Sequence, residues 1–253
     1  MMNRRKALAF GLASIACMTT TCRCFAATTP VSCGCTLTDD QAEAVLPAWS
    51  GTPLASDSGL RLVSSGNRDL DYALAQTLQR LTDTFGVLPG FAYFDDFAGP
   101  NAFATERQYL SRSDGTVLFG RRMLEKCLSA AEAPDAVISG VCAHEFGHIA
   151  QFKLGLMPRL TAGQTTVKRK ELHADFLAGY FAGTRKLQKP DFPAAVYATS
   201  AYSVGDNRED NQRHHGTPEE RAAAVVKGFE TAFRDHRTFA EAAQTGLNYV
   251  LTL

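Results

Sequence analysis

The segment His144-Glu145-Phe146-Gly147-His148 constrains this chain more than any other stretch of it. Its two histidines are four residues apart, and on an α-helix that spacing places both side chains on the same face. The two imidazoles can then reach one metal ion. Glu145 lies about 100° further round the helix, where its carboxylate can reach a water molecule on that ion. The segment therefore predicts two metal ligands and a general base on one helix.

The sequence on either side of the two histidines favours such a helix. Pro134 and Asp135 are typical of a first helical turn, and Gly155 is typical of a C-terminal stop. Apolar residues recur between them at helical spacing, so the predicted helix runs from about residue 134 to residue 154. Gly147 weakens a helix by about 1 kcal/mol relative to alanine, which predicts a close approach of another part of the chain there.

A second predicted helix, from about Val167 to Leu187, carries two carboxylates four residues apart. A catalytic zinc ion takes three protein ligands and leaves a fourth position for water, and Glu171 is the best candidate for the third ligand. Asp175 could then accept the other ring N–H of a ligand histidine and fix its tautomer. The alternative is a solvated acidic pair beside the basic run Lys168-Arg169-Lys170.

These segments resemble a known family. HEFGH followed by ELHAD is similar to the gluzincin zinc metallopeptidases, and most similar to the M48-like peptidases and the bacterial neutral zinc metallopeptidase family. Asn101-Ala102-Phe103-Ala104 resembles the segment that precedes the M48 active-site helix, and His215–Arg221 resembles a later histidine-to-arginine segment. The resemblance covers about residues 91–229. The chain departs from it at Gly216, where M48 enzymes have proline, and in lacking their transmembrane helices.

The resemblance implies an α+β, mainly helical zincin-like domain with a small β-sheet before the His144 helix. It implies Zn²⁺ bound by His144, His148 and Glu171, and hydrolysis of a peptide bond by a metal-activated water with Glu145 as the base. Because the resembling families place a histidine there, His215 is the candidate donor to the oxyanion.

Other side chains have weaker claims on the site. A surface position next to a helix cap is the alternative for His215, and Arg221 is expected to brace its loop by pairing with Asp175. The weaker candidates for the oxyanion donor are Tyr180, Tyr197 and Tyr202. The histidines predicted to be exposed and uninvolved are His173, His214 and His236.

The start of the chain is predicted to be a signal peptide, residues 1–26. Arg4-Arg5-Lys6 is followed by a short apolar run and by a loose cleavage pattern at Cys24-Phe25-Ala26. This run is too short to span a bilayer comfortably, so no transmembrane helix is expected in the mature chain. The protein is expected to be exported, either periplasmic or secreted, and the two arginines weakly resemble a twin-arginine signal. A weak lipoprotein pattern also leaves open a lipid anchor at Cys17.

Export would place four cysteines, Cys33, Cys35, Cys127 and Cys142, in an oxidising compartment. They allow three pairings, of which a bridge from Cys33 or Cys35 to Cys127 is favoured. Cys142 is expected to be a small buried core residue. A metal-binding role for Cys33-Gly34-Cys35 receives little weight, because the His144 set already completes a site.

Residues 27–66 are expected to be a loosely structured lead-in, with a short helix from Thr38, and residues 67–253 a single metallopeptidase domain. Further predictions are a helix over 67–85, strands over 91–94, 102–105 and 116–119, a loop over 200–214, and capping boxes at Thr217 and Thr238. Gly115–Phe119 is expected to be an exposed edge strand that binds an extended substrate, with a buried core strand as the alternative.

The sequence therefore predicts a zinc-dependent endopeptidase of the bacterial cell envelope that acts on proteins or peptides. Its formal net charge is zero, so no nucleic-acid partner is expected. Three alternatives remain: a zinc amidase that acts on cell-wall peptides, an exported zinc-binding protein without activity, and a chaperone-like or assembly factor. The intact Glu145 argues against a pure binding protein.

Overall fold

The computed structural model describes residues 35–37 and 64–253. The predicted signal peptide, the lipid anchor at Cys17, Cys33 and the helix from Thr38 lie outside these residues. Strand β1 falls within the segment predicted to be loosely structured. Within the described part of the chain no helix is both long and apolar enough to cross a bilayer.

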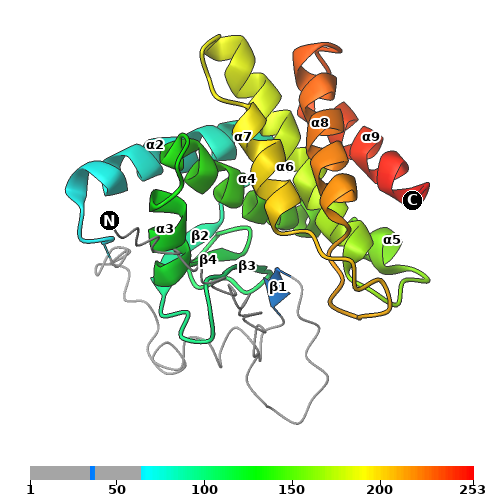
Figure 1. The fold of residues 1–253 in the computed structure, drawn as a ribbon, viewed down its shortest axis with the longest axis horizontal. Helices are drawn as coiled ribbons and strands as arrows, with labels where there is room; N and C mark the ends of the chain where they lie inside the picture. Colours follow the sequence, from blue (N-terminus) through cyan, green and yellow to red (C-terminus); the bar gives the residue numbers. More distant parts are fainter. Residues whose placement is uncertain (1–34, 38–63) are drawn as a thin grey trace, which may run out of the picture.

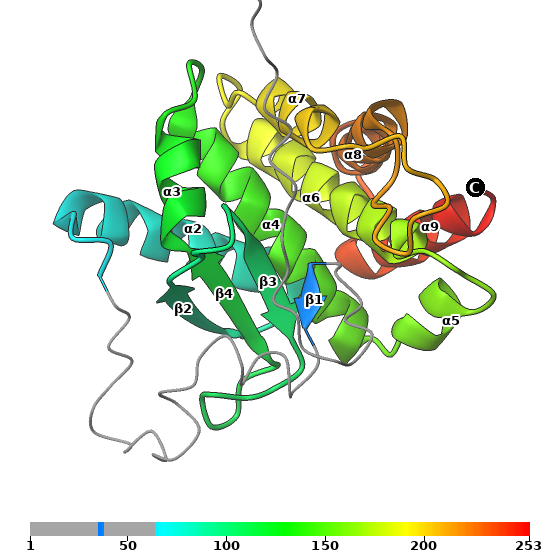
Figure 2. The same cartoon turned by 60° about the horizontal axis from the view of Figure 1, so that its bottom comes forward.

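The protein is an α+β fold in which a small mixed sheet packs on one side of a group of helices (Figure 2). The strand order is β1-β3-β4-β2; β3 and β4 are antiparallel, while β1 pairs with β3 and β2 with β4 in parallel. The strands are β1 (Thr36–Leu37), β2 (Gly90–Phe94), β3 (Ala102–Thr105) and β4 (Thr116–Gly120).

The prediction of an exposed edge strand at Gly115–Phe119 is wrong. Strand β4 has neighbours on both sides, and each of its residues is buried. Strand β3 lies nearer the edge, and within the part of the chain that the structure describes its outer side pairs with the two residues of β1. An apolar run such as Thr116–Phe119 fits a central strand as well as an edge strand, because burial on both faces removes the alternation that would distinguish them.

The helices follow the predicted pattern with three additions. The helices predicted around His144, around Glu171 and over residues 67–85 are confirmed to within a residue or two, and so are both capping boxes. Helices α3 and α5 were not predicted, and α7 extends into the predicted loop over 200–214. The helices are α2 (Arg68–Phe85), α3 (Arg121–Leu128), α4 (Pro134–Lys153), α5 (Met157–Thr161), α6 (Lys168–Gln188), α7 (Ala195–Ser203), α8 (Pro218–Phe233) and α9 (Phe239–Leu251).

Helix α4 lies between the sheet and α6, and α8 and α9 pack on the far side of α6 (Figures 1 and 2). A helix covered on several sides buries almost its whole circumference, and α4 accordingly buries every residue from Cys142 to Gln151. The same holds for α6 from Lys170 to Gly183. The histidines of both helices are therefore removed from water, and so are Glu145, Glu171 and Asp175.

Close contact between helices fixes the relative positions of these side chains. A Cβ atom at Gly147 would lie 3.2 Å from the backbone of Ala174, which confirms the predicted close approach at this glycine. At the next crossing, a Cβ at Gly228 would lie 1.8 Å from the carbonyl oxygen of Phe176. No other residue fits at Gly228 without separating α6 from α8, so the glycine brings Arg221 of α8 within reach of Asp175 on α6.

Candidate metal centre

Three side chains from α4 and α6 converge at one point. The Nε2 atoms of His144 and His148 are 3.2 Å apart, and Glu171 Oε2 lies 3.2 Å from the first and 3.4 Å from the second. Cys35, beside β1, completes a group of four whose ligand-type atoms all lie within 4.8 Å of one another. These four residues could hold a metal ion.

His144 is oriented by a buried ion pair. Asp175 Oδ1 accepts a hydrogen bond from His144 Nδ1 at 2.8 Å, and Arg221 donates to the same carboxylate from Nε at 2.7 Å and from Nη2 at 2.9 Å. Because a carboxylate only accepts, His144 carries a proton on Nδ1, and its Nε2 atom is the one that faces Glu171 and the cluster. Burial raises the pKa of Asp175, but Arg221 and His144 outweigh it and lower the pKa to about 2.

His148 is oriented by a different chain of hydrogen bonds. His173 Nε2 donates to the carbonyl of Ala243 at 3.0 Å, which leaves its Nδ1 free to accept from the amide nitrogen of Gln151 at 3.2 Å. That nitrogen also donates to the carbonyl of Lys170 at 2.7 Å, so the Gln151 oxygen faces His148 Nδ1 at 3.0 Å. His148 must then donate from Nδ1, and its Nε2 lone pair also faces the cluster.

The prediction that His173 and His214 are exposed is therefore wrong. Both are buried, whereas His236 is exposed. Burial lowers the pKa of His173 to about 4, so this ring is neutral, as its role as an acceptor requires. His214 donates from Nδ1 to Asp206 at 2.8 Å, away from the cluster. No signal in the sequence separates His173 from the surface histidines, because its partners lie 22 and 70 residues away.

Glu145 is buried beside the cluster, and its Oε2 has no hydrogen-bond partner among residues 35–37 and 64–253. Burial raises the pKa of this carboxyl to about 8. An unsatisfied carboxylate oxygen in the interior is unfavourable unless a water or a cation satisfies it, and a nearby dication would return the carboxyl to its ionised form. The two Nε2 atoms that converge on Glu171, with this carboxylate oxygen beside them, fit a bound cation together with its water.

Glu171 is ionised, and both of its carboxylate oxygens accept hydrogen bonds. Burial acts to raise its pKa, but His148 and His144 outweigh it and hold the pKa well below the usual value. While Oε2 faces the two histidines, Oε1 accepts a hydrogen bond from the backbone N–H of Cys35 at 3.1 Å. The carboxylate therefore links α6 to the segment that carries Cys35.

The favoured disulfide to Cys127 is wrong, since Cys35 and Cys127 are both free thiols and Cys127 lies on α3 in the apolar core. Cys35 belongs to the segment given little weight as a metal ligand, and the structure places it among the predicted ligands. Cys142 is a buried core residue, as predicted. Without a cation, burial and the nearby Glu171 and Glu145 raise the pKa of the Cys35 thiol to about 12.

His215 lies at the start of the segment that leads into α8. Its backbone N–H donates to Asp206 at 3.2 Å, and its ring is largely buried. Burial lowers its pKa, and Glu171 opposes that shift, which places His215 within electrostatic range of the cluster. All three tyrosines considered for the same role are bonded elsewhere. Tyr180 donates to the carbonyl of Arg237, Tyr197 is bonded to Ser139, and Tyr202 donates to Glu219 at 3.3 Å.

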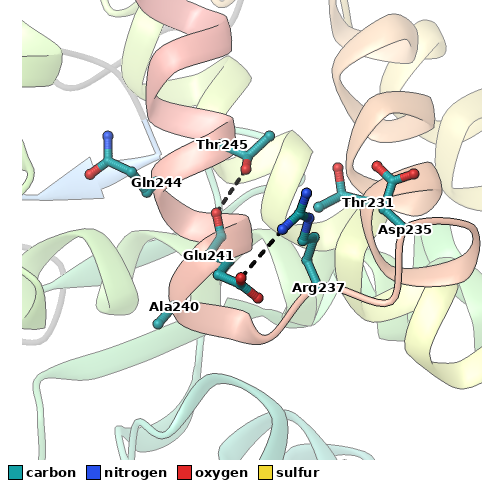
Figure 3. Close-up of a pocket in the computed structure, with 7 residues that line it drawn as sticks. All are labelled: Thr231, Asp235, Arg237, Ala240, Glu241, Gln244 and Thr245. Atoms are coloured by element: carbon teal, nitrogen blue, oxygen red, sulfur yellow. Dashed lines mark hydrogen bonds and ion pairs between the residues drawn. The ribbon is translucent and has the colours of Figure 1, made fainter.

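A separate hollow lies between the end of α8 and the start of α9 (Figure 3). Arg237 and Glu241 pair within it at 3.4 Å, and none of the four clustered residues lines it. Its lining is Thr231, Asp235, Arg237, Ala240, Glu241, Gln244 and Thr245.

Comparison with known proteins adds no relative. The chain matches no family model, and no curated protein or solved structure matches it significantly.

Proposed function

We propose that the protein is an exported zinc-dependent endopeptidase with a zincin-like fold of the gluzincin type. One observation supports the proposal most: the Nε2 atoms of His144 and His148 and the Oε2 atom of Glu171 converge within 3.4 Å of one another, with the Glu145 carboxylate buried beside them. Two imidazole nitrogens and one carboxylate oxygen form a ligand set found at catalytic zinc ions. Export is inferred from the signal-like sequence of residues 1–26.

His144, His148 and Glu171 would hold the ion. When bound, zinc supplies a Lewis acid that acidifies a water molecule and polarises the substrate carbonyl. Glu145 takes a proton from the attacking water on its free Oε2 and passes it to the leaving amine. Asp175 and Gln151 keep the protons of the two histidines on Nδ1, so that both Nε2 atoms stay available. His215 donates a hydrogen bond to the oxyanion from its neutral ring.

The test is Glu145→Gln in the mature protein, compared with Glu219→Gln at a position on α8 outside the cluster. The amide keeps the shape of Glu145 but cannot take a proton. We expect zinc content of one ion per chain in both variants. We expect Glu145→Gln to lose peptide hydrolysis by several orders of magnitude, as enzymes do when a catalytic base is removed. Glu219→Gln should keep its activity.

The assay is a digest of a peptide library and of cell-wall muropeptides, each with and without a chelator. Cleavage confined to muropeptides would favour the amidase alternative. Full activity in Glu145→Gln would show that another group is the base. The wild type and Cys35→Ala could each bind one zinc ion and yet hydrolyse neither substrate. That result would favour a metal-binding protein without activity.

A further inference from the structure

The backbone of Cys35 is held beside the cluster by contacts with α6 and with the sheet. Its backbone N–H donates to Glu171 Oε1 at 3.1 Å, and its carbonyl accepts from the N–H of Ala104 on β3 at 2.8 Å. The next residue, Thr36, accepts a hydrogen bond through its hydroxyl from the ammonium group of Lys170, which is 5 % exposed. These contacts join a residue early in the chain to α6 and to the sheet.

The thiol completes a ligand set. His144, His148 and Glu171 provide three donors, and Cys35 provides a fourth within the same 4.8 Å. Zinc sites with four protein ligands are closed, whereas catalytic sites keep one position for water. Thiolate sulfur is a preferred ligand of zinc, so a thiol at this distance competes directly with water for the fourth position.

The same segment also covers an edge of the sheet. Strand β1 pairs in parallel with β3, with Thr36 opposite Ala104 and Leu37 opposite Thr105. Without β1, the backbone groups of β3 would be unpaired on that side, next to the cluster. An extended peptide binds to such an edge by adding a strand, so β1 occupies the place where a substrate backbone would lie.

We propose that Cys35 binds the metal as a fourth ligand while β1 fills the substrate-binding edge of β3, so that this segment holds the enzyme in a latent form. The inference rests on the proposed peptidase function. The thiol releases its proton to solvent when the sulfur binds, and the segment presents a sulfur to the metal where a substrate would present a carbonyl. Hydrolysis then requires residues 35–37 to leave the site.

The first experiment measures ligation without measuring activity. The full-length mature chain is loaded with Co²⁺, because a thiolate ligand gives cobalt an intense near-ultraviolet charge-transfer absorption that nitrogen and oxygen ligands do not give. We expect this absorption in the wild type and in Cys127→Ala, a buried free thiol that serves as the matched control. We expect Cys35→Ala to lose it while keeping one cobalt ion per chain.

The second experiment measures latency with the zinc-loaded proteins and an unstructured peptide. A tethered ligand acts at a high effective concentration, so Cys35→Ala should raise kcat/KM by at least roughly tenfold over the wild type and over Cys127→Ala. Lys170→Met, which removes the donor to Thr36 but no thiol, should give a smaller rise. A chelator should abolish hydrolysis in every variant.

The outcomes separate this inference from the peptidase function. Thiolate absorption that persists in Cys35→Ala, or a wild type that lacks it, would overturn the ligand assignment. Equal hydrolysis by the wild type and Cys35→Ala would overturn the latency while leaving the peptidase intact. Thiolate absorption with no hydrolysis by any zinc-loaded variant would overturn latency and peptidase together, and would leave a closed, structural metal site.

Discussion

The metal cluster has two walls that are built in different ways. The helical wall consists of His144, His148 and Glu171 on α4 and α6, and each of them is held by buried hydrogen bonds from other side chains. The strand wall is residues 35–37, held by hydrogen bonds to Glu171 and Lys170 and by pairing with β3. The helical wall is part of the core, whereas the strand wall is attached to it from outside.

This difference has a physical consequence. To move a helical ligand, the crossing of α4 and α6 must open, and at Gly147 that crossing leaves no space for even a methyl group without displacement. To move Cys35, its hydrogen bonds to Glu171 and β3, the bond from Lys170 to Thr36 and any bond of the thiol to a metal must break, but no helix crossing has to open. A ligand set divided in this way suits a site in which three ligands are permanent and the fourth is exchangeable.

The largest effect is expected from removing a ligand of the helical wall. Glu171→Ala should lower metal affinity by more than about 100-fold, beyond the loss typical of a supporting residue, because one of three fixed ligands is gone. Cys35→Ala should retain its metal under the same dialysis. Metal content of both variants, measured by elemental analysis after dialysis, makes the comparison. Equal losses would show that the two walls are equivalent, and no loss in Glu171→Ala would remove it from the ligand set.

An intermediate effect is expected from the hydrogen bonds behind the helical wall. Gln151→Leu removes the acceptor that keeps the His148 proton on Nδ1, and should weaken metal binding by roughly 10- to 100-fold. Gln151→Glu keeps an acceptor there and should lose less. The measurement is competition with a metallochromic chelator. Equal losses in the two variants would mean that the tautomer of His148 is not what Gln151 controls.

The smallest effect concerns protons in the same network. The pKa of His173 is about 4 in the folded protein and 6.5 in its ordinary range, so the unfolded chain binds more protons between these values. The free energy of unfolding of the metal-free protein should therefore fall as pH drops from about 6.5 to about 4.

The measurement for His173 is urea unfolding at several pH values, for the wild type and for His173→Gln. Other groups titrate in the same range, but the difference between the two curves isolates this ring. The variant should show a shallower fall in stability with acid. Parallel curves would mean that His173 is not held in its neutral form by burial.

Much of the fold follows from local patterns. The bounds of α2, α4 and α6 agree with the predicted ones because apolar spacing, caps and helix stops act within a few residues. The pairing of Arg221 with Asp175 was also expected and is present, at 2.7 Å. The position of β4 in the sheet was predicted wrongly, because strand order depends on which segments meet and not on the composition of one of them.

The sequence by itself determined that two imidazoles and a carboxylate share one helix, since residues four apart on an α-helix must lie on one face. Only the tertiary structure decided which side chains complete that group. Cys35 reaches Glu171 across 136 residues. Gln151 aligns His148 only because α6 supplies its hydrogen-bond partners and α9 supplies the acceptor that orients His173. Helical periodicity describes neighbours along the chain, whereas these contacts arise from the packing of distant segments, which no local spacing specifies.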